Sequence, residues 1–284
     1  MKVRGRRRSS NVNDIRGKRG RIPGGGLGGG AVLLLMLVVY LFTGELPGGL
    51  MEGNQRAAQP PAQQQVQVEG EDALFEFASV ALADTEDAWT EIFAREGASY
   101  QPPQMTVYSD YVHSACGGQS AQVGPFYCPG DQTVYLDLSF YNDLHQRLGA
   151  RGDFAFSYVI SHEVGHHVQR ETGIMGQVQR IQQQVSKERA NEWNVALELQ
   201  ADYLAGVVAR YQDEMGVLDE GDIEEAISAT IAVGDDTIQK RAQGYVVPDS
   251  FTHGTAQQRM EWYQRGYEAG DLSQWDTYTA LGLQ

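Results

Sequence analysis

The sequence predicts a helix-dominated α+β domain with a small sheet, preceded by one transmembrane helix. Apolar residues recur at helical spacing over long stretches, whereas only two short stretches alternate as strands do. A stretch without charge also lies between residues 22 and 44, directly after a cluster of basic residues. The 284 residues are enough for one or two domains, and a hydrophobic content of 42% excludes a wholly disordered chain.

The expected elements follow one another without a visible internal repeat. The patterns predict two short strands, near residues 104–109 and 132–138. The expected helices cover residues 72–95, 158–168, about 175–190, 191–213, 221–233 and 255–268.

The first 44 residues have the order expected of a membrane anchor. Residues 1–22 hold nine Lys or Arg side chains against one acid, Asp14, and an apolar run follows from Ala31 to Phe42. The run is short for a bilayer, but the charge-free stretch around it is long enough. A buried core helix and a cleaved signal peptide are the alternatives, and no A-x-A-like cleavage site follows Phe42. We therefore expect a signal anchor at 23–44 with the basic head, 1–22, in the cytoplasm.

The rest of the chain is then expected outside the cytoplasm. Residues 45–70 are rich in Gln, Pro, Gly and Ala, as flexible linkers are, and a domain at 71–284 follows. The whole chain carries a formal charge of −15 despite its basic head, so this domain is strongly acidic. Such a surface repels phosphate backbones, which excludes nucleic acid as the expected partner.

The two cysteines fit export from the cytoplasm. Cys116 and Cys128 are the only ones in the chain, and in an oxidising compartment such a pair closes a loop as a disulfide. Two reduced thiols are the alternative. Structural zinc sites draw on closely spaced pairs of ligands, which this chain does not offer among its cysteines.

The most informative motif lies within an apolar helical pattern. His162 and His166 are four residues apart, so both imidazoles share one helix face, and Glu163 stands between them. This H-E-x-x-H arrangement supplies two nitrogen ligands for Zn²⁺ and a carboxylate that reaches the zinc-activated water. Two histidines buried in a core are the alternative, but a carboxylate on such a helix is costly to bury without a partner.

A third ligand is expected from the helix at 191–213. Glu198 and Asp202 lie one turn apart among Ala, Leu and Gly, where solvated acids are unusual. We expect Glu198 to bind zinc and Asp202 to hold the N–H of a ligand imidazole. The two roles exchanged, or an acid pair half exposed to solvent, are the alternatives.

With these motifs the chain resembles a known family. The H-E-x-x-H motif followed by Glu198-Leu-Gln-Ala-Asp202 is similar to the E-x-x-A-D signature of glutamate-ligand zinc peptidases, such as the prenyl-protein proteases. Residues 75–280 resemble the putative neutral zinc metallopeptidase family of bacterial single-pass proteins. The likeness includes Cys116-Gly117, the segments 125–129, 134–138, 158–168, 198–206 and 248–254, and Gln258-Arg259. It implies a zincin-like domain in the bacterial envelope, with a peptide or protein as substrate.

The resemblance also gives roles to His253 and Arg259. A similar His-x5-Arg lies near the zinc of the prenyl-protein proteases, which implies that His253 steadies the oxyanion. A packing role for His253, with Arg259 paired to Glu261 or Asp249, is the alternative; Thr252 or Ser250 is expected to cap the helix at 255–268.

The parts together predict a zinc metalloendopeptidase. Glu163 would take a proton from zinc-activated water and return it to the leaving amine, while His253 stabilises the oxyanion. The strand at 132–138 is expected to serve as the edge along which the substrate backbone lies. Two other classes of function remain open: a membrane-tethered interaction domain without zinc, and a zinc-binding scaffold that does not cut.

Overall fold

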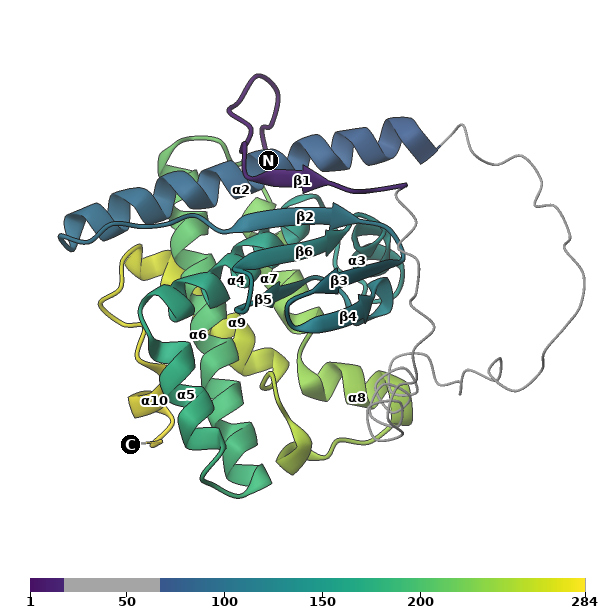
Figure 1. Ribbon diagram of the computed structural model, residues 1–284. Coiled ribbons are helices and arrows are strands. Elements are labelled where there is room, and N and C mark those ends of the chain that lie inside the picture. The colour runs from purple at the N-terminus through teal and green to yellow at the C-terminus, as the bar shows by residue number, and fades with distance from the viewer. Residues whose placement is uncertain (18–66, 284) are drawn as a thin grey trace, which may run out of the picture.

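The computed structural model describes residues 1–17 and 67–283, and these form helices packed beside a small sheet (Figure 1). Its helices are α2 (Gln67–Arg95), α3 (Phe140–Gln146), α4 (Phe154–Glu171), α5 (Ile174–Gln182), α6 (Lys187–Glu214), α7 (Asp222–Ala232), α8 (Asp235–Gln243), α9 (Ala256–Ala269) and α10 (Thr277–Ala280). Its strands are β1 (Val12–Asp14), β2 (Gln104–Tyr108), β3 (Tyr111–Ser114), β4 (Gly117–Ser120), β5 (Phe126–Cys128) and β6 (Thr133–Asp137). The predicted class, α+β with helix dominant and a small sheet, is confirmed.

The main sheet has four strands in the order β1-β2-β6-β5. The first three are parallel to one another, whereas β5 runs antiparallel to β6. The strand expected at 132–138 is therefore present as β6, but it lies inside the sheet. The prediction that it is the edge strand is wrong, because the three-residue β5 covers it on the side nearer α4.

The helices α4, α6 and α9 pack side by side and bring distant parts of the sequence together (Figure 1). Small residues allow this closeness. A Cβ added to Gly206 on α6 would lie 2.1 Å from the carbonyl oxygen of Tyr263 on α9, and one added to Gly165 on α4 would lie 3.1 Å from the carbonyl oxygen of Ala201. The backbone of α6 thus lies in direct contact with those of α4 and α9. This close packing fixes the positions of the side chains near the two crossings.

Helix boundaries follow capping residues that the apolar pattern does not show. Ser186 accepts a hydrogen bond from the backbone N–H of Arg189 at 3.3 Å and starts α6, so the helix expected up to residue 190 ends earlier, as α5. Thr255 caps α9 in a capping box with Gln258. The expectation that Thr252 or Ser250 caps this helix is therefore wrong.

The N-terminal residues pack on the domain, although we expected residues 1–22 to form a separate basic head. In residues 1–17, β1 extends the sheet and pairs in parallel with β2. Arginines of this segment pair with acids on α2: Arg6 with Asp84, Arg7 with Glu86 and Asp87, and Arg8 with Glu76. The basic charge thus has an intramolecular partner, which a reading of the first 22 residues alone does not reveal.

The predicted anchor at 23–44 lies outside the described residues, as does most of the predicted linker at 45–70, whose last residues belong to α2. Among the helices of the described ranges, none is both long and apolar enough to cross a membrane.

Candidate metal centre

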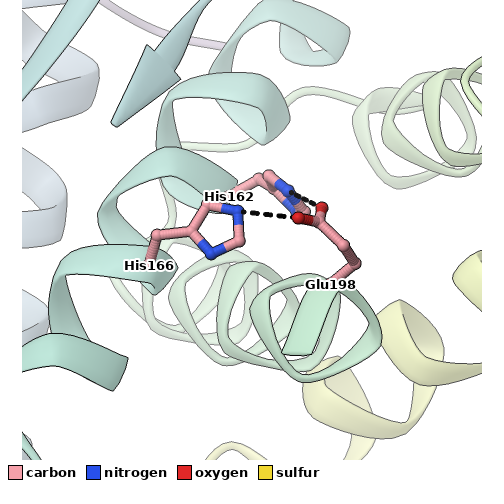
Figure 2. Close-up of side chains that lie close together, drawn as sticks. All are labelled: His162, His166 and Glu198. Carbon is pink, nitrogen blue, oxygen red and sulfur yellow. Dashed lines mark hydrogen bonds and ion pairs between the residues drawn. The ribbon is translucent and has the colours of Figure 1, made fainter. Parts of the chain in front are cut away.

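The side chains of His162, His166 and Glu198 meet where α4 crosses α6 (Figure 2). Nε2 of His162 lies 3.2 Å from Oε2 of Glu198, and Nε2 of His166 lies 3.5 Å from Oε1. One ligand atom from each residue lies within 4.8 Å of the others. Two imidazole nitrogens and a carboxylate in this arrangement suit Zn²⁺, so the donor set fits the metal that the sequence predicts.

Both histidines are held by the ring nitrogen that faces away from Glu198. Nδ1 of His162 donates to Oδ1 of Asp202 at 2.9 Å, and Nδ1 of His166 donates to Oε1 of Gln169 at 2.9 Å. These bonds fix the tautomer in which each Nε2 is free to bind a metal. Asp202 therefore lies where the sequence predicts it, whereas sequence reasoning missed Gln169, although it follows His166 by three residues on the same helix.

Asp202 is fully buried and accepts hydrogen bonds from three side chains. Besides His162, these are Tyr158 at 2.6 Å and Arg259, whose Nε and Nη2 donate at 2.8 and 2.9 Å. Burial raises the pKa of Asp202, but Arg259 and His162 outweigh this and lower it to about 2. The partner of Arg259 is thus Asp202, and not Glu261 or Asp249.

Glu163 follows the first ligand on α4 and lines the same cavity as the three metal-binding candidates. The side chain is buried. Burial raises the pKa of its carboxyl group, while His162 and His166 oppose the shift without cancelling it. A carboxylate with a raised pKa beside a metal site has the properties of a general base.

His253 lines the same cavity, and 49% of its side chain is exposed. Asp235, the first residue of α8, holds it in place. Its carboxylate pairs with Nδ1 of His253 at 3.2 Å and accepts the backbone N–H groups of Thr252 and His253 at 2.7 and 2.6 Å. Sequence reasoning missed Asp235, because α8 itself was not predicted.

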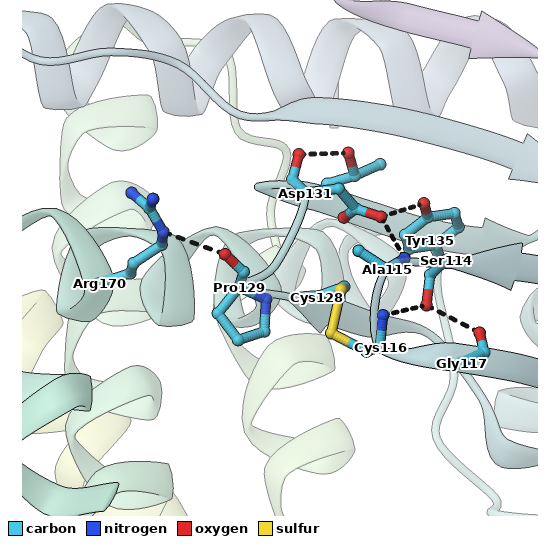
Figure 3. The surroundings of a disulfide bond; sticks show 10 residues. Ser114, Ala115, Cys116, Gly117, Cys128, Pro129, Asp131, Tyr135 and Arg170 are labelled. Carbon is cyan, nitrogen blue, oxygen red and sulfur yellow. Dashed lines mark hydrogen bonds between the residues drawn. A yellow bond between two sulfur atoms is a disulfide. The ribbon is translucent and has the colours of Figure 1, made fainter.

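Tyr127 of β5, the edge strand nearer α4, and Pro129, which follows this strand, both contact the metal-site helix α4. The hydroxyl of Tyr127 donates to Nδ1 of His167 at 2.9 Å, and Nε2 of His167 donates to the carbonyl of Gln101 at 2.6 Å. Arg170 on α4 also donates to the carbonyl of Pro129 at 3.1 Å (Figure 3). The strand is therefore fixed relative to His162 and His166.

The predicted disulfide between Cys116 and Cys128 is confirmed (Figure 3). It links Cys116, the residue before β4, to Cys128, the last residue of β5. Asp131 adds to this link, because its Oδ2 accepts from the backbone of Ala115 and from the hydroxyl of Tyr135, both at 2.8 Å. The β3–β4 hairpin is thus tied to the edge strand that borders the site.

A helix-borne H-E-x-x-H motif completed by a glutamate from a second helix defines the class of glutamate-ligand metal sites. Comparison with known proteins identifies the family to which the chain belongs. The chain belongs to the family described as "Putative neutral zinc metallopeptidase", whose profile matches residues 1–278.

Two relatives extend this comparison. The chain is 46% identical over 288 residues to the uncharacterized protein YpfJ of Escherichia coli K12, covering 98% of this chain and 99% of that protein. It is 42% identical over 195 residues to the uncharacterized protein Rv2575 of Mycobacterium tuberculosis H37Rv, covering 65% of each chain. No solved structure matches the chain.

Proposed function

We propose that this protein is a zinc-dependent peptidase that hydrolyses peptide bonds at the centre formed by His162, His166 and Glu198. The observation that carries the proposal is the convergence of their three ligand atoms beside the buried carboxylate of Glu163, in the wall of a cavity of about 390 Å³. Zinc in such a site supplies Lewis-acid chemistry, polarising a carbonyl group and making water more acidic.

The chain's own residues supply the proton transfers. Glu163 accepts a proton from the attacking water and passes it to the amine that leaves. His253, held by Asp235, donates a hydrogen bond to the oxygen of the scissile carbonyl as negative charge develops there. Asp202 and Gln169 keep the two ligand imidazoles oriented.

The edge strand β5 is the element that fits the substrate backbone. It pairs with β6 on one side only within the described sheet, and Tyr127 in it borders the cavity. An extended peptide lying along β5 adds one more strand beside the metal site. This role belongs to β5 in place of the strand at 132–138 that the sequence analysis favoured.

The proposal also places the domain outside the cytoplasm, attached to a membrane through residues 23–44. The disulfide supports an oxidising compartment. A single crossing between residues 17 and 67 would, however, put β1 and β2 on opposite sides of the membrane. Because these strands pair, we propose that residues 1–17 lie on the same side as the domain, in contrast to the cytoplasmic head expected from charge, and that residues 23–44 attach the chain to the membrane without crossing it.

The variant Glu163→Gln tests the proposed chemistry. It keeps the size and hydrogen bonding of the side chain but cannot accept a proton, so hydrolysis should fall by roughly two to four orders of magnitude. Zinc should remain bound at about one ion per chain, measured by mass spectrometry of the metal, because the ligands are unchanged. His166→Ala should lose the metal itself. Bound zinc in the wild type without hydrolysis of any peptide in a diverse library would favour the non-catalytic scaffold instead.

A further inference from the structure

The cavity that contains the metal site is lined by two chemically different sets of side chains. One set is polar or charged and includes the ligand candidates, Glu163, His253 and Arg259. The other set is apolar and comes from separate elements: Val123, Phe126, Phe140, Leu148, Val159 and Ile238. Among the described lining residues, every charged side chain is a ligand candidate or one of the residues named with them.

Contacts between its walls hold the apolar part in shape. Gly124, at φ 79°, lies against the ring of Phe140, since a Cβ added there would be 3.3 Å from that ring. Arg241 of α8 donates to the carbonyl of Leu148 at 2.8 Å. This bond ties the helix that carries Ile238 to the loop that carries Leu148. The pocket is therefore formed before a substrate binds.

The apolar walls remain half-buried in the free protein. Phe126, Phe140, Leu148 and Ile238 all have intermediate exposure. An apolar side chain placed between them would remove this surface from water, at a gain of about 25 cal/mol for each Å². A charged or amide side chain would lose its water there without finding a partner, which is costly.

We propose that this apolar pocket is the specificity pocket of the peptidase and takes a large apolar side chain, such as leucine, methionine or phenylalanine, next to the scissile bond. The inference rests on the proposed function. The volume of about 390 Å³ is near the lower limit for ligand pockets, so it suits one side chain together with the adjoining peptide backbone. Because β5 contributes Phe126 to the pocket and Tyr127 beside it, a peptide lying on this strand passes both regions.

Cleavage of a proteome-derived peptide library by the zinc-loaded full chain tests the preference. Mass spectrometry of the products should show leucine, methionine and phenylalanine enriched at one position beside the cut, with acidic and basic residues depleted. Replacing the leucine of a good substrate by alanine should lower kcat/KM by at least about tenfold. Cleavage without preference at either flanking position would overturn the inference and leave the proposed peptidase activity standing.

The variant Ile238→Asp assigns the preference to this pocket. It puts a carboxylate on the apolar wall, so kcat/KM for leucine peptides should fall at least about tenfold, while peptides with lysine at that position should gain relative to them. Ile231→Asp is the matched control, because Ile231 is 40% exposed on α7 and does not line the cavity. Equal zinc content and equal thermal unfolding of the two variants exclude misfolding. An unchanged preference in Ile238→Asp would contradict the proposal.

A binding measurement tests the specificity pocket independently of peptide hydrolysis. Glu163→Gln is used with a dye-labelled alanine heptapeptide that has one central leucine, and with the same peptide carrying a central aspartate. Fluorescence anisotropy should show tighter binding of the leucine peptide by at least about tenfold, a difference that Ile238→Asp in the same background removes. Equal binding of the two peptides would overturn the pocket even if no hydrolysis were detected, whereas absence of hydrolysis alone would count against the proposed function only.

Discussion

Gln169 accepts a hydrogen bond from Nδ1 of His166, 2.9 Å away and three residues earlier on α4. The side chain is itself fixed, because its amide donates to the carbonyl of Leu197 at 2.6 Å and to Gln200 at 3.1 Å. The orientation of one ligand candidate thus depends on contacts between α4 and α6, the two helices that supply the metal centre.

Gln169→Leu should therefore weaken zinc binding. The leucine fills a similar volume but leaves Nδ1 of His166 without an acceptor, which should lower zinc affinity by about ten- to a hundredfold. Competition with a fluorescent chelator measures the affinity. Gln179→Leu is the control, because Gln179 is exposed on α5. Equal affinities in the two variants would mean that Gln169 has no part in orienting the ligand.

The buried pair of Asp202 and Arg259 predicts a loss of stability as well as of metal affinity. Arg259→Met leaves the Asp202 carboxylate buried without its cation, at a cost of about 3–5 kcal/mol in the free energy of unfolding. Arg259→Lys should recover little of this, because lysine cannot donate the two parallel hydrogen bonds that arginine makes here. Urea denaturation of the metal-free proteins provides the measurement.

Asp202→Asn distinguishes the two carboxylates on α6. We expect it to lower zinc affinity by about ten- to a hundredfold, since Asp202 contacts the far side of His162, whereas Glu198→Gln should abolish high-affinity binding. The reverse order of severity would make Asp202 the ligand and Glu198 its support.

The pairing of β1 with β2 predicts a cross-link in the intact protein. Asn13 and Thr106 are register partners, so cysteines at these positions should oxidise to a disulfide, detected by mass spectrometry after digestion of membranes from living cells. A cysteine at position 13 combined with one at Gln179, exposed on α5, should not cross-link. If the first pair also stays unlinked while a reporter placed after residue 70 is active outside the cytoplasm, residues 1–17 lie on the other side of the membrane.

The residues that sequence reasoning could place are those whose chemistry repeats with the helix period. His162, Glu163 and His166 on α4, and Glu198 and Asp202 on α6, are spaced so that each set shares a helix face, and apolar neighbours make such polar residues conspicuous. Gln169 has the same kind of spacing, three residues after His166, but glutamine on a helix is too common to attract notice. The disulfide could be predicted from the sequence because the chain holds only two cysteines.

Features that depend on tertiary pairing could not be predicted. The edge strand β5 has three residues, too few for an alternating pattern to show. Helix α8 is polar, and Asp235 at its start becomes informative only when the fold brings it to His253, eighteen residues later. Arg6 and Arg7 pair with acids about 80 residues away on α2, so the basic cluster resembles the cationic flank of a membrane anchor when the sequence is read locally.

The pairing of Asp235 with His253 predicts a pH-dependent difference in stability between the wild type and Asp235→Asn. Burial raises the pKa of Asp235, but His253 and backbone N–H groups lower it overall. The Asp235 carboxylate therefore contributes to the free energy of unfolding above its unfolded pKa of about 4, and this contribution is lost as the pH falls through the lower pKa of the folded state. Burial lowers the pKa of His253, but Glu198 and Asp235 raise it overall. The protonated imidazole therefore contributes to the free energy of unfolding below about pH 6.5, and this contribution is lost as the pH rises through the higher pKa of the folded state. The advantage of the wild type over Asp235→Asn should therefore be largest between roughly pH 4 and 6.5 and should decrease on both sides. Urea denaturation from about pH 3 to about pH 9 tests the expectation, and a difference that stays the same from one end of this range to the other would show that the two side chains do not form a charged pair in solution.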